Sequence, residues 1–379
     1  MLRPLVMFGY SLIFIVTIIF YSGFLNVILP YYKTIQNLGE ISVKWQYLTE
    51  HKDDYDAIFL GPSTTYFGVI PKLFDKYMTT EGKSVKSFNF GIAGANVSEL
   101  DFYLQKILAL KPANLKWIFL DCSVDLFTNI GSTSAQEIYW HTPRKTIENF
   151  QLILESSTDS WKVKVPYIYA NFQSFIYRWL GIGQLSTLWQ ERILNLDLSN
   201  SDPLAKVSED RLIQESGYYA IDWQKKSERW KTIFLANGLN TYQKNLKNEQ
   251  IKLANLKSDS AFNNPSTIYG VKMMKNIASR IEQQQQINKN KIEAIFFIPP
   301  ILETDSNPSA LYRAYKSGYI ETLFAFNNPN NFTNLYELDR RIDSAHLNHQ
   351  GAQEFTLLLA SEFTEYLNNS GEKFMNGRV

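Results

Sequence analysis

The sequence predicts an α/β protein: a three-layer α/β/α domain with a parallel sheet, a mostly helical insertion and an N-terminal transmembrane helix. Residues 5–29 are uncharged and apolar, over a length that suits one membrane span of about 20 or more residues. Farther along, short apolar runs alternate with helical stretches, a pattern typical of a parallel sheet covered by helices on both faces. Residues 137–265 interrupt that alternation with helical periodicity and few candidate strands.

The composition allows a large buried core and excludes some classes of partner. The chain has 379 residues, of which 45% are hydrophobic and 20% charged. Its 38 basic and 37 acidic residues give a formal net charge of +1, which argues against a nucleic-acid partner held by bulk charge. Cys122 is the single cysteine, so no intramolecular disulfide can form and the redox compartment is not revealed.

The apolar N-terminal stretch predicts an uncleaved signal anchor over residues 1–32. It is longer than the apolar region of a usual signal peptide, and no clear small-x-small cleavage site follows it. Arg3 precedes the stretch and Lys33 follows it, so the charge bias for orientation is weak. We expect a single-pass protein of the cell membrane with its main domain outside the cytoplasm, on the periplasmic or cell-surface side. A domain on the cytoplasmic side is the alternative.

The remaining elements are expected in a regular order. Residues 33–50 predict a helical connector, and the two halves of the α/β core, 51–136 and 266–379, flank the insertion. The predicted strands are 56–60, 85–90, 116–121, 293–298 and 332–338. The predicted helices are 97–110, 266–288 and 350–368, and another begins within 66–74.

Ser63 lies just after the first predicted strand, at the edge where parallel sheets gather ligands. A serine needs a general base, and the base needs an orienting carboxylate, to act as a nucleophile. The segment DSAHLNHQGA, residues 343–352, places Asp343 three residues before His346, within reach of its ring. The alternatives are that Ser63 is a helix N-cap and that Asp343 is a capping residue beside a surface histidine.

These two blocks resemble the SGNH (GDSL-like) hydrolase family. In that family the serine follows the first strand in a Gly-Asp-Ser motif, and an Asp-x-x-His motif lies near the C-terminus. The corresponding blocks here are Gly61-Pro62-Ser63 and Asp343-Ser344-Ala345-His346. The resemblance covers about residues 51–135 and 266–368, and it implies that Ser63 is the nucleophile, His346 the base and Asp343 its orienter.

The resemblance also implies donors to an oxyanion. The family's second block supplies a glycine N–H, for which Gly91 and Gly94 are the candidates, and we favour Gly94. The third-block Gly-x-Asn is absent, and Ser123 is the candidate replacement for its asparagine. Pro62 stands where the family usually has aspartate, but Ser63 keeps its own N–H.

The anchor, the altered blocks and the large insertion are similar to the membrane-anchored SGNH-like proteins of bacterial envelope modification. These include the alginate and cellulose O-acetylation proteins and the D-alanyl-teichoic-acid protein. The resemblance implies a serine O-acyltransferase that carries acetyl to an envelope polysaccharide, beside a multispanning membrane acyltransferase and without a cofactor. The alternatives are an esterase that deacylates a glycan or lipid, and a catalytically degenerate glycan-binding or scaffold protein.

His349 lies three residues after His346, and the resulting Asp-x-x-His-x-x-His pattern is a hint of metal ligands. A metal site needs a further cluster of ligands at suitable spacing, and the sequence offers none. We therefore expect no metal, and we interpret His349 as a surface residue or a support of the site.

Overall fold

The computed structural model describes residues 2–28, 38–124, 134–155, 160–181, 203–255, 268–288, 291–302, 304 and 308–376. The chain divides into two compact units. The first, here called the anchor unit, comprises Met1–Gln46 and Asn129–Ser208. The second, the sheet unit, comprises Tyr47–Thr128 and Glu209–Val379. The segment predicted as one helical insertion, 137–265, is therefore shared between the two units.

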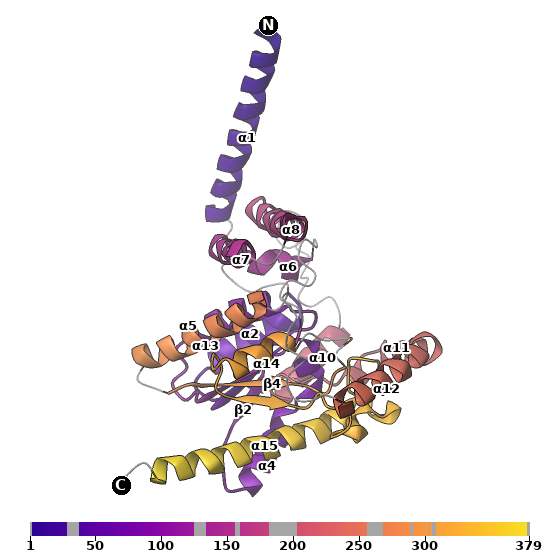
Figure 1. The fold of residues 1–379 in the computed structure, drawn as a ribbon. Coiled ribbons are helices and arrows are strands. Elements are labelled where there is room, and N and C mark those ends of the chain that lie inside the picture. The colour runs from indigo at the N-terminus through magenta and orange to yellow at the C-terminus, as the bar shows by residue number, and fades with distance from the viewer. Residues whose placement is uncertain are drawn as a thin grey trace. The chain divides into compact units, whose positions relative to one another are not determined.

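The sheet unit is built on five parallel strands in the order β2-β1-β3-β4-β5 (Figure 1). The strands are β1 (Ala57–Leu60), β2 (Ser87–Asn89), β3 (Trp117–Asp121), β4 (Glu293–Ile298) and β5 (Leu323–Ala325). This confirms the predicted α/β class with a parallel sheet, and the first four strands lie within the predicted ranges.

The prediction of a fifth strand over residues 332–338 was wrong. Those residues form the 3-10 turns η7 (Thr333–Tyr336) and η8 (Leu338–Arg340), and the fifth strand is β5. Their backbone N–H groups are used within the turns: Leu335 donates to the Phe332 carbonyl at 3.0 Å and Glu337 to the Asn334 carbonyl at 3.2 Å. Groups bonded in this way are not available to pair with a neighbouring strand.

Helices cover both faces of the sheet (Figure 1). One face carries α5 (Val97–Ala109), α13 (Ile268–Asn288) and α14 (Ser309–Lys316), and the other carries α3 (Ser63–Gly68), α4 (Pro71–Thr80) and α15 (His349–Asn376). The α15 face is joined by aromatic packing. The ring of Phe119 in β3 packs edge-to-face against those of Phe363 in α15 and Phe74 in α4, with ring centroids 4.9 and 5.6 Å apart.

The later part of the helical insertion belongs to the sheet unit and closes the β2 edge of the sheet. The N–H of Asn89, the last residue of β2, donates to the carbonyl of Ser216 at 2.8 Å. Gly217 follows with φ +88°, and a Cβ there would lie 2.1 Å from the Asn89 carbonyl oxygen, so only glycine fits. The helices of this part are α10 (Pro203–Gln214), η2 (Ile221–Trp223), α11 (Ser227–Ile233), η3 (Phe234–Gly238) and α12 (Leu239–Asn255).

The anchor unit contains α1 (Leu2–Ile28), α6 (Ala135–Trp140), α7 (Pro143–Glu155) and α8 (Trp161–Trp179). Within α1, Val6–Phe24 is long and apolar enough to cross a membrane, with a mean hydropathy of 1.9 and 6% of the segment buried. It is the one such helix in the described part of the chain. The predicted connector is represented by α2 (Glu40–Glu50), and residues 33–37 lie outside the described residues.

Candidate active site

Ser63 is the first residue of α3, three residues beyond the end of β1. Pro62 is the N-cap of this helix, and its carbonyl accepts the N–H groups of Thr65 at 3.1 Å and Tyr66 at 3.0 Å. The helix has no side-chain cap, so the Ser63 hydroxyl does not fulfil the capping role considered above. Its Oγ lies instead 2.8 Å from Nε2 of His346.

The two threonines after Ser63 fix this turn to β3. Thr64 and Thr65 both donate their hydroxyls to Oδ2 of the fully buried Asp121, at 2.6 and 3.1 Å. A Cβ on Gly61 would lie 2.0 Å from Thr65 Oγ1 and 2.7 Å from Asp121 Cβ, so the turn requires glycine at that position. Burial raises the pKa of Asp121, and the hydrogen bonds that it accepts, first from Ser123 and then from Thr64, oppose the rise.

Asn89, at the end of β2, holds α3 from the other side. Its Nδ2 donates to the carbonyls of Thr65 at 2.9 Å and Val69 at 2.7 Å. Its Oδ1 accepts the N–H of Gly91 at 2.8 Å. The short helix that carries Ser63 is therefore fixed by buried side chains from two strands, β2 and β3, and this rigidity orients the Ser63 hydroxyl.

Asp343 and His346 lie in a short loop immediately before α15. The Asp343 Oδ1 accepts the N–H groups of Ala345 at 2.8 Å and His346 at 2.7 Å, which makes an Asx turn. The Ile342 N–H donates to the His346 carbonyl at 3.0 Å and closes the base of the loop. The aspartate thus shapes the backbone that presents the histidine.

Arg341 holds the backbone of this loop in place. Its side chain is completely buried. Its guanidinium donates to the carbonyls of Asp343 at 3.2 Å and Ser344 at 2.7 Å on one side, and to those of Leu335 at 2.9 Å and Pro300 at 3.1 Å on the other. The planar fork of donors suits several carbonyl acceptors at once, which a lysine could not match.

The three predicted residues Ser63, His346 and Asp343 are brought together in one line. His346 Nδ1 lies 2.9 Å from both carboxylate oxygens of Asp343, and Nε2 lies 2.8 Å from Ser63 Oγ. An ionised carboxylate only accepts hydrogen bonds, so Nδ1 carries the proton and the lone pair of Nε2 faces the serine hydroxyl. The imidazole is therefore in the tautomer that can take the proton of Ser63.

The surroundings of Asp343 favour its ionised form. Burial raises its pKa, but the side-chain hydrogen bond from His346 and the backbone N–H groups of Ala345 and His346 outweigh burial and hold the pKa below its ordinary value. The side chains of His346 and Asp343 remain 21% and 32% exposed. Solvent or a substrate can therefore reach the pair formed by the ionised Asp343 carboxylate and the His346 imidazole.

Two of the predicted oxyanion donors are used within the protein. Gly91 donates its N–H to Asn89, and Ser123 donates both its N–H (3.1 Å) and its hydroxyl (2.6 Å) to Asp121 Oδ1. Gly94 lies in a turn with φ +74° and open space where a Cβ would be, and its role stays a prediction. Ser63 opens α3, and the N–H of a first helical residue has no acceptor within its own helix.

His349 contacts residues of the insertion rather than Ser63, His346 or Asp343 in the contacts that the structure describes. Its Nδ1 lies 2.9 Å from the hydroxyl of Tyr218, its ring lies 5.5 Å from that of Trp223, and its N–H donates to the Asp222 carboxylate. Within the described residues, no group of three or more His, Cys, Asp and Glu side chains is placed to hold a metal ion.

Comparison with known proteins adds no identification. No protein-family model matches the chain, and no curated protein matches it. The geometry of the site has the elements of an activated nucleophile: a serine, a base in the correct tautomer and an ionised carboxylate.

Proposed function

We propose that the chain is a membrane-anchored serine O-acyltransferase that modifies a cell-envelope polysaccharide outside the cytoplasm, with acetyl as the transferred group. The observation that carries the proposal is the 2.8 Å approach of Ser63 Oγ to His346 Nε2, with Asp343 on the other ring nitrogen. The resemblance of the serine and Asp-x-x-His blocks to SGNH hydrolases supports the same assignment.

The proposed reaction has two steps. Ser63 Oγ attacks the acyl carbonyl carbon of the donor as its proton passes to His346 Nε2, and the departing oxygen or sulfur takes that proton. A sugar hydroxyl then attacks the acyl-enzyme carbonyl and gives its proton to His346, which returns it to Ser63 as the ester bond to the serine breaks. Asp343 stabilises the imidazolium that exists between these transfers.

The membrane part of the proposal rests on α1, whose apolar side chains are exposed along its candidate span. A polysaccharide acceptor and an adjacent multispanning acyltransferase, which would pass acyl groups across the membrane, are supported by the resemblance to envelope-modifying proteins. Nucleic acid and cofactors have no part in the proposed reaction.

Hydrolysis is the second candidate function. The partial exposure of His346 and Asp343 lets water reach the acyl-enzyme, and water would then replace the sugar hydroxyl in the second step. The same residues would act in the same roles, and the product would be free acetate from a glycan or lipid ester.

A direct test treats the full chain, in detergent, with an activated acetyl ester. Mass spectrometry of peptides is used to find acetyl on Ser63, and released acetate is measured in parallel. We expect both signals in the native chain and in Ser317→Ala, a matched exposed serine on the sheet unit, and neither in Ser63→Ala. Added envelope glycans then separate transfer from hydrolysis.

Acetylation that persists in Ser63→Ala would contradict the assignment of the nucleophile. No acetylation and no turnover in the native chain would instead favour the scaffold alternative, for which the internal use of the Gly91 and Ser123 donors is the motivating observation.

A further inference from the structure

The helix α8 of the anchor unit buries polar side chains, which reverses the usual arrangement of a water-soluble helix. Amphipathic helices of soluble proteins normally turn apolar residues inward and polar residues outward. The buried residues of α8 are Lys164, Asn171 and Ser174, whereas the neighbouring α7 buries polar and apolar residues together, namely Lys145, Thr146, Asn149, Leu152 and Ile153.

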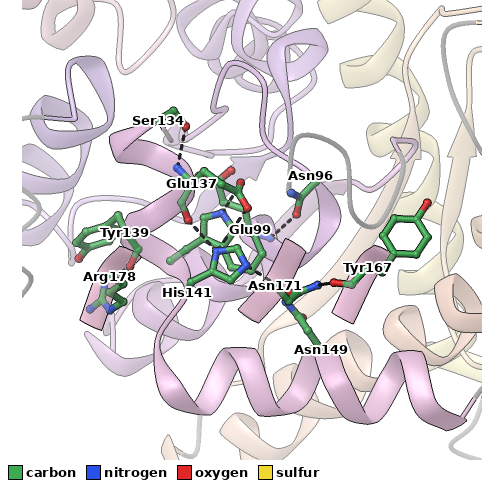
Figure 2. A network of polar contacts seen from close by, with 11 residues as sticks. Asn96, Glu99, Ser134, Glu137, Tyr139, His141, Asn149, Tyr167, Asn171 and Arg178 are labelled. Atoms are coloured by element: carbon green, nitrogen blue, oxygen red, sulfur yellow. Dashed lines mark hydrogen bonds and ion pairs between the residues drawn. The ribbon is translucent and has the colours of Figure 1, made fainter. Parts of the chain in front are cut away.

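Two of these inward residues, Asn149 and Asn171, are joined to each other and to His141 by hydrogen bonds within the anchor unit (Figure 2). Asn171 Oδ1 accepts from Asn149 Nδ2 at 2.7 Å and lies 3.3 Å from His141 Nε2, and Asn171 Nδ2 donates to the Tyr167 carbonyl at 2.8 Å. Burial lowers the pKa of His141 to about 4, so this ring is neutral near pH 7. The polar interior of the anchor unit is therefore a specific hydrogen-bonded network, and it fixes α8 with these polar side chains facing inward.

The outward face of α8 carries a continuous row of large apolar and aromatic side chains. Trp161, Val165, Tyr169 and Phe172 are 64%, 55%, 66% and 50% exposed. Their spacing of four, four and three residues places them on one face of the helix. We call these four residues the apolar stripe. An exposed apolar row of this size on a soluble surface marks a place that contacts another apolar phase or partner.

Two features of the anchor unit indicate that the apolar stripe contacts a lipid bilayer. α1, the candidate membrane span, belongs to the same unit and contacts α8. The α8 sequence, WKVKVPYIYANFQSFIYRW, contains Lys162, Lys164 and Arg178 and no acidic residue. Aromatic rings beside basic side chains are the composition of helices that lie in the interface of an anionic bilayer.

We propose that α8 is a membrane-surface helix whose apolar stripe enters the boundary between headgroups and acyl chains of an anionic bilayer, next to the point where α1 is anchored. The exposed Lys162 lies among the lipid phosphates, with its aliphatic stem along the apolar surface, whereas Lys164 and Arg178 face inward and donate to the carbonyls of Leu154 and Tyr139. The proposal goes beyond the acyl-transfer function and does not depend on it, because α8 contributes no residue of the Ser63 site.

The test measures lipid contact at single positions in the full chain. Val165→Cys and Phe172→Cys are made separately with Cys122→Ala, labelled with the environment-sensitive dye NBD, and reconstituted at low density into vesicles of phosphatidylcholine and phosphatidylglycerol. Tyr315→Cys, which replaces a 47% exposed residue of the sheet unit, is the control. The side chains replaced by cysteine are all exposed, and the shared change at the buried Cys122 removes only one sulfur atom, so the variants should fold.

We expect the dye at both stripe positions to emit at shorter wavelength and to be quenched several-fold more by nitroxide-labelled lipid than the dye at position 315. The difference should weaken in vesicles of phosphatidylcholine alone. Equal emission and quenching at the stripe and control positions would overturn the proposal, and would assign the stripe to a protein partner that the vesicles lack. This readout is independent of turnover, so it separates failure of this inference from failure of the proposed reaction.

Discussion

Asp343 performs two tasks with one carboxylate. It accepts the Nδ1 proton of His346, and it accepts two backbone N–H groups of its own loop. The hydrogen bond from the His346 side chain and the two backbone N–H groups all lower its pKa. An asparagine oxygen could still accept the backbone N–H groups, whereas only the carboxylate supplies a charged acceptor to Nδ1 as well.

Asp343→Asn is expected to reduce acetyl turnover on the order of 10⁴-fold, because an amide can donate to Nδ1 and so place the ring proton on Nε2, where it blocks uptake of the Ser63 proton. The measurement is kcat with the activated ester. The control is Asp54→Asn, since Asp54 forms an exposed pair with His51, also three residues apart, at 3.2 Å. Equal losses in both variants would show that the effect is not specific to the site.

The residues of the site could be predicted from the sequence only where they lie in a short recognisable motif. Asp343 and His346 are three apart in a recognisable block, and Ser63 follows a clear strand. Asp121 and Arg341 were missed as organisers of the site, because their importance depends on partners far away in the chain, such as Thr64 for Asp121 and Pro300 for Arg341. An acidic residue that ends an apolar strand was the only available signal for Asp121.

At the level of elements, the start of α15 is held against the histidine loop by a close backbone contact. Asn348 Oδ1 accepts the Gly351 N–H at 2.9 Å. A Cβ on Gly351 would lie 2.3 Å from the Arg340 carbonyl oxygen and 3.0 Å from a methyl carbon of Leu347. The helix and the loop can approach this closely only because residue 351 has no side chain.

Gly351→Ala is therefore expected to destabilise the fold by about 1–3 kcal/mol, since the backbone of the loop must move to make room. Denaturant unfolding of the full chain in detergent, followed by tryptophan fluorescence, measures the change. Gly68→Ala is the matched control, because a Cβ there meets only Phe355 ring atoms at an ordinary 3.6 Å. A Gly351→Ala variant as stable as the control would contradict the argument from close contact.

The link between α4 and β2 is expected to make stability depend on pH. Asp75 of α4 accepts the Ser87 hydroxyl at 2.6 Å and the Ser87 N–H at 3.1 Å. Burial raises its pKa from 3.8 to about 7, against the opposing effect of those hydrogen bonds. Between these two values the folded protein keeps a proton that the unfolded chain has lost, so this contribution to stability falls as pH rises through the window.

Asp75→Asn should remove this contribution, and the decline in unfolding free energy from about pH 4 to pH 7 should be shallower than in the native chain. Unfolding midpoints at several pH values provide the measurement, and Asp54→Asn serves again as the control. A slope unchanged by Asp75→Asn would show that the carboxyl is ionised in the folded state throughout this range.

Strand prediction succeeded for β1, β3 and β4, which lie in apolar runs, and for β2, which lies in the alternating segment VKSFNF, but it failed for β5. The three residues of β5 are too few to show a period, whereas FTNLYEL alternates well enough to resemble a strand. That segment instead turns twice, and its Asn334 carbonyl accepts the Glu337 N–H at 3.2 Å. Which of two candidate segments pairs with β4 is decided by tertiary packing, and local sequence does not contain that information.

On the scale of the whole molecule, the proposed function predicts a topology that can be tested. The candidate span lies near the N-terminus, and the proposed function places the sheet unit outside the cytoplasm. Tyr315→Cys with Cys122→Ala should therefore react with a membrane-impermeant maleimide in intact cells whose outer envelope has been permeabilised. The native chain, whose Cys122 is 1% exposed, should not react. Labelling only after the cells are lysed would place the sheet unit in the cytoplasm.

The segment that closes the β2 edge also bears on how this protein can be shortened. Ser216 and Gly217 occupy hydrogen-bonding positions beside Asn89 that a strand from another molecule would otherwise find open. The same segment also fills the core, because Phe234 and Tyr242 pack in the hydrophobic cluster beside the strands and the Tyr242 hydroxyl donates to the Tyr336 carbonyl at 2.7 Å. Residues 209–265 therefore cannot be trimmed away as a separate module: their removal would expose the border of the sheet and open its core at the same time.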